Sequence, residues 1–160
     1  MKTAAIRIAL ATVALLTILA FGVALAQEGT NLIVVDSIVW GREGIHDEAL
    51  TCAQTSRFFH GEQVVWRIKV VDPVTGAEMT DADLTSVEVM LVTGEVFEAE
   101  YGGHPPRDPV DEYWTTAWVV PDDFPTGVLD YSIEALANDG RMGELVVFPL
   151  TVSSLTIVAQ

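Results

Sequence analysis

The chain has 160 residues, with 23 acidic and 8 basic side chains, and its formal net charge at pH 7 is −15. A chain this acidic lacks the basic patches that neutralise phosphate, so we expect no nucleic-acid partner and no binding to an anionic membrane surface. Hydrophobic residues make up 50% of the sequence, which is enough to bury the core of one ordinary domain.

Residues 1–26 have the three parts of a secretory signal peptide. Lys2 and Arg7 form a short positive region, and an apolar run follows from Ile8 to Leu25. The run closes on Ala24-Leu25-Ala26, which places small residues before a cleavage site. We therefore expect an exported protein, periplasmic or extracellular, without membrane contact after cleavage. The alternative is an uncleaved membrane anchor, because the run approaches the roughly 20 residues that span a bilayer.

Residues 27–160 are expected to form one domain without an intramolecular disulfide. Cys52 is the only cysteine, and an exported domain with a single thiol must take its stability from an apolar core. The sequence of this domain alternates between short apolar strands and turn residues and shows no helical period.

Seven strands are predicted, and the clearest of them is residues 63–71. There, Val64, Trp66, Ile68 and Val70 share one face, while Arg67 and Lys69 lie on the other. The other predicted strands are 32–40, 86–92, 95–101, 113–120, 128–137 and 144–152, with 155–158 as an extension of the last.

Turn residues between the predicted strands favour an antiparallel arrangement. Thr93-Gly94 and Asn138-Asp139-Gly140 predict hairpins. We expect an all-β, antiparallel sandwich of about seven strands, with a small closed barrel as the alternative. Trp114 and Trp118 share one strand face and are expected to fill the core, the alternative being an exposed platform for sugar stacking.

The stretch PDDFPTGVLDYSIEALANDG, residues 121–140, resembles the penultimate-strand region of bacterial immunoglobulin-like and fibronectin-type-III-like domains. The residues that carry the resemblance are Gly127, Tyr131, Ala135, Asp139 and Gly140. The resemblance implies an immunoglobulin-like β-sandwich. Antibody domains carry a cysteine two positions after the tyrosine, where this chain has Ile133, so no antibody-type disulfide is expected.

Successive connections in such a sandwich alternate between its two ends. We expect one end to hold residues 41–62, 93–94 and 121–127, and the other to hold 72–85, 102–112 and 138–143. At the second end, three prolines in GGHPPRDP (102–109) fix the backbone and project His104, Arg107 and Asp108 with little entropy to lose on binding. We predict that these three residues contact a partner, with Arg107 as a bidentate anchor for a carboxylate.

Two sets of side chains are candidates for binding copper. One imidazole with two thioethers suits Cu(I), and the first set is His104, Met79 and Met142. The second set, within the connection 41–62, is Cys52, His60 and His46, whose spacing matches no standard zinc signature. The alternative for both sets is that these side chains have unrelated structural roles and no cofactor is bound.

The sequence contains no nucleophile elbow, no zinc-protease motif and no phosphate-binding glycine loop, so we expect no enzymatic activity. We predict a non-enzymatic binding or interaction module that contacts a protein partner in the cell envelope through the loops at one end of the sandwich. The alternatives are a periplasmic or extracellular copper-binding protein and a purely structural envelope domain.

Overall fold

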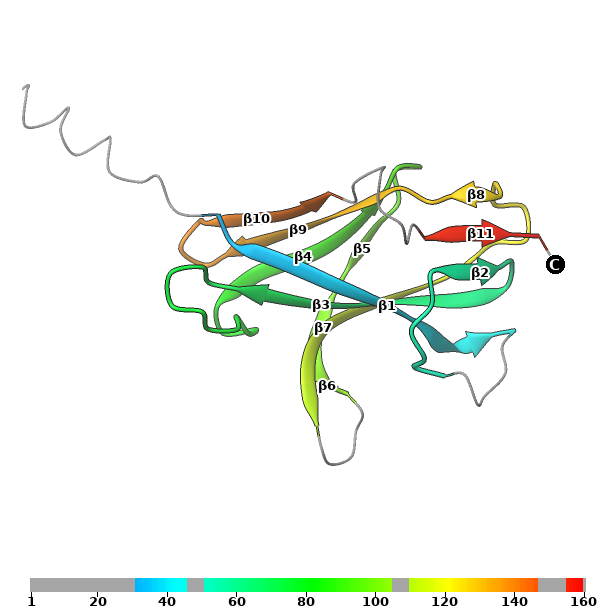
Figure 1. The fold of residues 1–160 in the computed structure, drawn as a ribbon. Helices are drawn as coiled ribbons and strands as arrows, with labels where there is room; N and C mark the ends of the chain where they lie inside the picture. The colour runs from blue at the N-terminus through cyan, green and yellow to red at the C-terminus, as the bar shows by residue number, and fades with distance from the viewer. Residues whose placement is uncertain (1–30, 46–50, 105–109, 147–154, 160) are drawn as a thin grey trace, which may run out of the picture. The chain divides into compact units, whose positions relative to one another are not determined.

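Figure 1 shows the fold in a computed structural model, which describes residues 31–45, 51–104, 110–146 and 155–159. These residues belong to one compact unit, Asn31–Gln160. They form eleven β-strands and no helix, so the predicted all-β class is confirmed for them. Within the same ranges there is accordingly no helix that could span a membrane. The predicted signal peptide lies outside the described residues.

Two four-stranded antiparallel sheets make up most of the fold. The first has the order β1-β3-β7-β6, with bounds Ile33–Gly44, Glu62–Val71, Asp111–Val119 and Glu100–His104. The second has the order β10-β9-β4-β5, with bounds Met142–Val146, Tyr131–Ala137, Leu84–Leu91 and Val96–Glu98. The chain crosses from one large sheet to the other after β3, after β5 and after β7. These are two sheets with separate strand orders, not one closed barrel.

A third, small sheet has the order β2-β11-β8, with bounds Arg57–Phe59, Thr156–Val158 and Gly127–Val128. Its middle strand, β11, pairs in parallel with β2 and antiparallel with β8. The three strands lie together near the C-terminus in Figure 1. Phe58 and Ile157 of this sheet are almost completely buried, so the sheet contributes to the same core as the large sheets.

Aromatic contacts join the two large sheets. Trp66 of β3 is fully buried, and its ring lies nearly parallel to that of Phe97 of β5, with the centroids 6.3 Å apart. The ring of Tyr131, on β9, meets Trp66 edge-on at 5.7 Å. The two sheets therefore face each other across a shared core, an arrangement compatible with a β-sandwich. Trp114 and Trp118 are also buried in this core, as expected, and do not form an exposed platform.

The described residues hold four strands more than the seven predicted. Residues 95–101 form two strands because the chain leaves β4 after Glu98 and joins β7 from Glu100, with Ala99 buried at the crossing. Residues 128–137 are likewise divided between β8 and β9, and β2 lies within the long connection 41–62. The prediction for 155–158 was wrong: β11 does not extend the last strand but pairs with β2 and β8. Residues 147–154 lie outside the described ranges.

Contacts between loops agree with part of the predicted grouping, although His104 of the connection 102–112 shares a surface groove with Arg42 and Cys52 of 41–62. At one end, Arg141 Nη1 lies 2.9 Å from Asp72 Oδ2, and the Asn138 side chain donates to the Ala82 carbonyl. At the other end, the Gly61 N–H donates to the Val120 carbonyl at 2.8 Å. The hairpin between β9 and β10 is also confirmed, because their residues pair in register on either side of the predicted turn.

One carboxyl–phenol pair connects β1 to the start of β9. The Tyr131 hydroxyl donates to Asp36 Oδ2 at 2.6 Å. Burial raises the pKa of Asp36, and the hydrogen bond from Tyr131 opposes that rise only in part. Burial and the neighbouring Asp36 carboxylate both raise the pKa of the Tyr131 hydroxyl. The native state therefore favours the protonated form of Asp36 more than the unfolded chain does.

This raised pKa predicts how stability changes with pH. Asp36 contributes stability below its ordinary pKa of 3.8, and that contribution is lost as the pH rises through the higher pKa of the folded state. Asn cannot ionise, so we expect the free energy of unfolding of Asp36→Asn, relative to wild type, to increase between about pH 3 and pH 6. Urea unfolding at several pH values measures this difference.

Asp111→Asn is the control with the opposite sign. Hydrogen bonds from Tyr113 and from Lys69 lower the pKa of Asp111, so its contribution is present above the ordinary pKa and is lost as the pH falls. The stability of Asp111→Asn relative to wild type should therefore decrease over the same rise in pH. If the relative free energy of unfolding changed with pH in the same direction for both variants, the raised pKa of Asp36 would be contradicted.

Candidate functional site

A groove of about 570 Å³ lies on the outer face of the β1-β3-β7-β6 sheet. Its floor consists of side chains that point away from the core, because alternate residues of a strand face opposite sides. Two neighbouring rows cross the strands in register. The apolar row is Val39, Val65 and Ala117, and the polar row is Arg67, Thr115 and Glu100.

A bulge in β1 forms one rim of the groove. The pairing of β1 with β3 shifts between Trp40 and Gly44, so Gly41, Arg42 and Glu43 lie opposite Gln63. Gln63 Oε1 accepts the backbone N–H groups of Arg42 at 2.9 Å and of Glu43 at 3.0 Å. Bulges redirect side chains at sheet edges, and this one places Arg42 and Glu43 on the groove.

Gly41 is required for this arrangement. A Cβ atom at position 41 would lie 1.9 Å from Gln63 Oε1, so any other residue would displace the Gln63 side chain. The displaced amide could no longer accept hydrogen bonds from the two backbone N–H groups of the bulge. The position of the Arg42 side chain therefore depends on Gly41 of β1, which leaves room for the amide of Gln63 on β3.

The segment before β2 forms the neighbouring part of the rim. The Cys52 N–H donates to the Trp40 carbonyl at 2.9 Å, and the Trp40 N–H donates in turn to the Ala53 carbonyl at 3.1 Å. A bridge between Val39 and Gln54 continues this pairing along the free edge of β1. Cys52 is exposed, has a φ of +67°, and lines the groove. Val39, at the groove floor beside this segment, is buried.

Two arginines in the groove have no carboxylate partner among the residues that the structure describes. The Arg42 and Arg67 side chains form no hydrogen bond or ion pair with any carboxylate that the structure describes, although Arg67 lies 5.7 Å from the centre of the Tyr113 ring. By contrast, Lys69 and Arg141 each form ion pairs with two carboxylates. The groove is also lined by acidic side chains, namely Glu43, Glu98 and Glu100.

His104 ends β6 and lines the same groove. Its Nε2 atom lies 3.4 Å from Thr115 Oγ1. Burial lowers the pKa of His104, and the positive charges of Arg67 and Arg42 lower it further. All three effects favour the neutral imidazole over the charged form.

Of the three predicted partner-binding residues, the structure describes one. His104 lies on the groove and is the last residue of β6, which includes the first three residues of the GGHPPRDP segment. Arg107 and Asp108 lie outside the described residues. The sequence analysis missed Arg42 and Arg67, since nothing local in the sequence shows which strands are neighbours.

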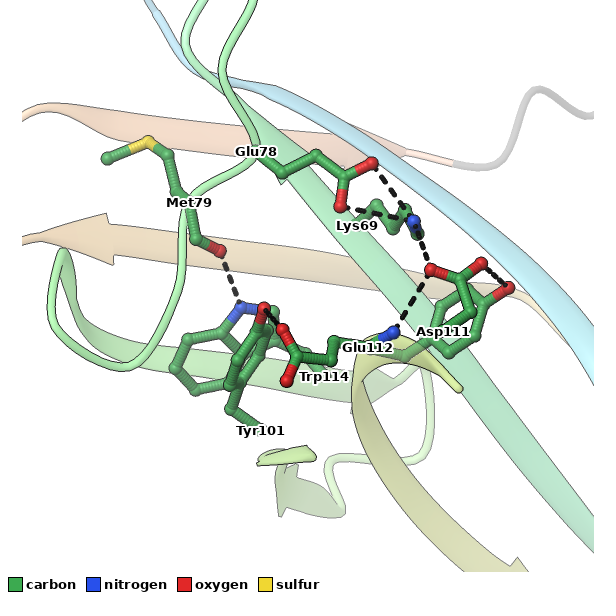
Figure 2. A network of polar contacts seen from close by, with 8 residues as sticks. Lys69, Glu78, Met79, Tyr101, Asp111, Glu112 and Trp114 are labelled. Carbon is green, nitrogen blue, oxygen red and sulfur yellow. Dashed lines mark hydrogen bonds and ion pairs between the residues drawn. The ribbon is translucent and has the colours of Figure 1, made fainter. Parts of the chain in front are cut away.

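The first candidate copper set is placed in three different surroundings. Met79 is buried in the core, and its carbonyl accepts the Trp114 indole N–H at 3.1 Å, as Figure 2 shows. Met142 is half-exposed on the edge strand β10, where it pairs with Leu136, and His104 lies on the groove.

The second set is also divided. Cys52 lies on the groove, whereas the His60 Nε2–H donates to the Phe124 carbonyl at 2.9 Å, and His46 lies outside the described residues. Among the residues described, no three His, Cys, Asp or Glu side chains form a group suited to a metal ion. Copper binding by either set stays a prediction.

A polar network holds the β6–β7 hairpin against the loop that follows β3. Figure 2 shows Lys69 Nζ between Glu78 and Asp111, 2.9 Å from an oxygen of each. The Tyr101 hydroxyl donates to Glu112 at 3.0 Å, and burial followed by this hydrogen bond raises the pKa of Tyr101 to about 12. Since His104 ends β6, the network helps to position it on the groove.

Comparisons of the chain with known protein families, with curated proteins and with solved structures find no match. The chemistry of the groove is thus argued from its own side chains. An open apolar floor beside two guanidinium groups can bind a ligand that carries both an apolar group and an anion.

The bulge predicts a stability difference between two glycine variants. Gly41→Ala should lower the free energy of unfolding by about 1–3 kcal/mol, because the two bulge N–H groups lose their acceptor. Gly102→Ala, on the same sheet, adds a Cβ atom to open space with no neighbouring side chain within 4 Å, and should change it by less than about 0.5 kcal/mol. Urea denaturation of both variants measures the effect, and equal values would contradict the role given to Gly41.

The electrostatics of the groove predict a pKa change. Arg67→Gln removes a positive charge near His104 and should raise the pKa of the imidazole. Arg57→Gln removes the same charge from a side chain that lies over Phe59 and should leave that pKa unchanged. A titration of the His104 ring protons by NMR measures both. An unchanged value in Arg67→Gln would show that the two side chains do not interact.

Proposed function

We propose that the protein is an exported, non-enzymatic binding module with an immunoglobulin-like β-sandwich, and that the groove on its β1-β3-β7-β6 sheet contacts a protein partner in the cell envelope. The groove takes the place of the loop end as the centre of the contact surface. His104 lies on this groove, and Arg107 and Asp108 stay predicted contacts.

The strand orders support the immunoglobulin-like assignment. In chain order, β1, β3, β4, β5, β6, β7, β9 and β10 correspond to strands A, B, C, C′, D, E, F and G. The first sheet then has the order ABED and the second the order GFCC′, which are the orders of immunoglobulin-like sandwiches. Tyr131 starts β9, where such domains carry a tyrosine at the start of strand F.

The observation that supports the binding function is a pair of arginines that meet no carboxylate in the described part of the chain. The chain has 23 acidic residues, so carboxylates are abundant, yet Arg42 and Arg67 face a groove and pair with none that the structure describes. Guanidinium groups bind carboxylates through paired hydrogen bonds and are enriched where proteins contact partners. The signal-peptide pattern of residues 1–26 supports export, and with it a partner in the envelope.

Photo-crosslinking in the cells that produce the protein tests this function. A photoreactive amino acid at Ala117, on the exposed groove floor, should capture a defined partner species. The same amino acid at Glu134, on the outer face of β9 in the other sheet, should not capture it. The charge reversal Arg67→Glu should greatly reduce capture from Ala117. Capture of the same species from both faces, or none from the groove, would refute the proposed function.

A further inference from the structure

The charges in the groove are arranged unevenly across the sheet. In the polar row, Arg67 on β3 and Glu100 on β6 are separated by Thr115 of β7, so the two charges lie two strands apart. Neighbouring strands are about 4.8 Å apart, which places the two backbones roughly 10 Å from each other. The β1–β3 side of the groove therefore carries both guanidinium groups together with Glu43, and the β6 side carries Glu100.

The chain's own charges restrict the anion that can bind. Glu98 and Glu100 line the groove opposite the arginines, so a ligand with several negative charges would place one of them against these carboxylates. The net charge of −15 also repels a strongly acidic partner and a second copy of this chain. The arrangement therefore favours one carboxylate in an otherwise uncharged or basic segment.

The two rows of the floor have the spacing of an extended peptide. Val65 and Arg67 are two residues apart on β3, and a strand advances about 7 Å over two residues. An extended segment that runs parallel to β3 has the same spacing between side chains on one face. An apolar side chain on the row of Val39, Val65 and Ala117 is then followed, two residues away, by a side chain beside Arg67.

We propose that the groove binds an extended segment of the partner in which an apolar residue and an Asp or Glu are two positions apart. The acidic side chain binds Arg67, and the apolar side chain packs on Val65 and Ala117. This inference rests on the proposed function of the groove and specifies the chemistry that the groove recognises.

Blocked pentapeptides are suitable probes. We expect acetyl-Gly-Val-Gly-Asp-Gly-amide to shift the side-chain NMR signals of Arg42, Arg67 and His104 in the protein as isolated, with a dissociation constant on the order of 1 mM. The Asn analogue should bind about tenfold more weakly, because it lacks the charge-assisted hydrogen bonds. Analogues with Val and Asp adjacent, or with Val replaced by Gly, should also bind more weakly.

Protein variants identify the contact. Arg67→Gln should weaken binding of the Asp peptide about tenfold, whereas Arg57→Gln, with the same change in net charge, should leave it within about twofold. Dispersed NMR spectra verify that each variant is folded.

Three outcomes would overturn the inference: equal binding of the Asp and Asn peptides, unchanged binding by Arg67→Gln, or equal effects of acetate and the peptide at the same concentration. The first two would exclude carboxylate recognition by Arg67, and the third would exclude an extended segment. If the peptides fail while crosslinking from Ala117 succeeds, the chemistry is wrong and the binding function stands. Failure of the crosslinking would remove the function itself.

Discussion

The alternation of side chains along β3 determines both the core and the groove. This strand pairs with β1 along one edge and with β7 along the other, so its side chains point alternately to the two faces of the sheet. Trp66 points into the core against Phe97 and Tyr131, and its neighbours Val65 and Arg67 must therefore point outward. A shift of one residue in register would bury Arg67 and expose Trp66. Packing of the indole against the other sheet thus fixes where the guanidinium lies.

The cations of this acidic chain divide into two kinds according to what surrounds them. Lys69 pairs with Glu78 of a loop and with Asp111 at the start of β7, and Arg141 pairs with Asp72 of the loop after β3. Because these pairs are partly exposed, each contributes little to stability, and their larger effect is to hold loops in place. Arg42 and Arg67 lie beside an apolar floor, where no described carboxylate meets them. The first kind completes the fold, and the second leaves bonding capacity for a ligand.

Local patterns were enough to predict the longer strands but not the small sheet or the groove. The period-two pattern of residues 63–71 and the turn at 138–140 identified β3 and the β9–β10 hairpin, because both signals act over a few residues. The groove combines side chains from β1, β3, β6 and β7, and their adjacency follows from a strand order that no local pattern encodes. Residue type was a poor guide in two cases. Met79 is a core residue, and His60 bonds a backbone carbonyl.

The two groove arginines are positioned by independent features of the fold. Arg67 follows from strand register alone, since β3 is regular and its opposite face is anchored in the core. Arg42 follows from the bulge, which exists because Gly41 leaves room for the Gln63 amide to accept two backbone N–H groups. A change at Gly41 therefore moves one guanidinium group and leaves the other in place. Because both charges act on His104, that imidazole reports on the two arginines together, although neither depends on the other for its position.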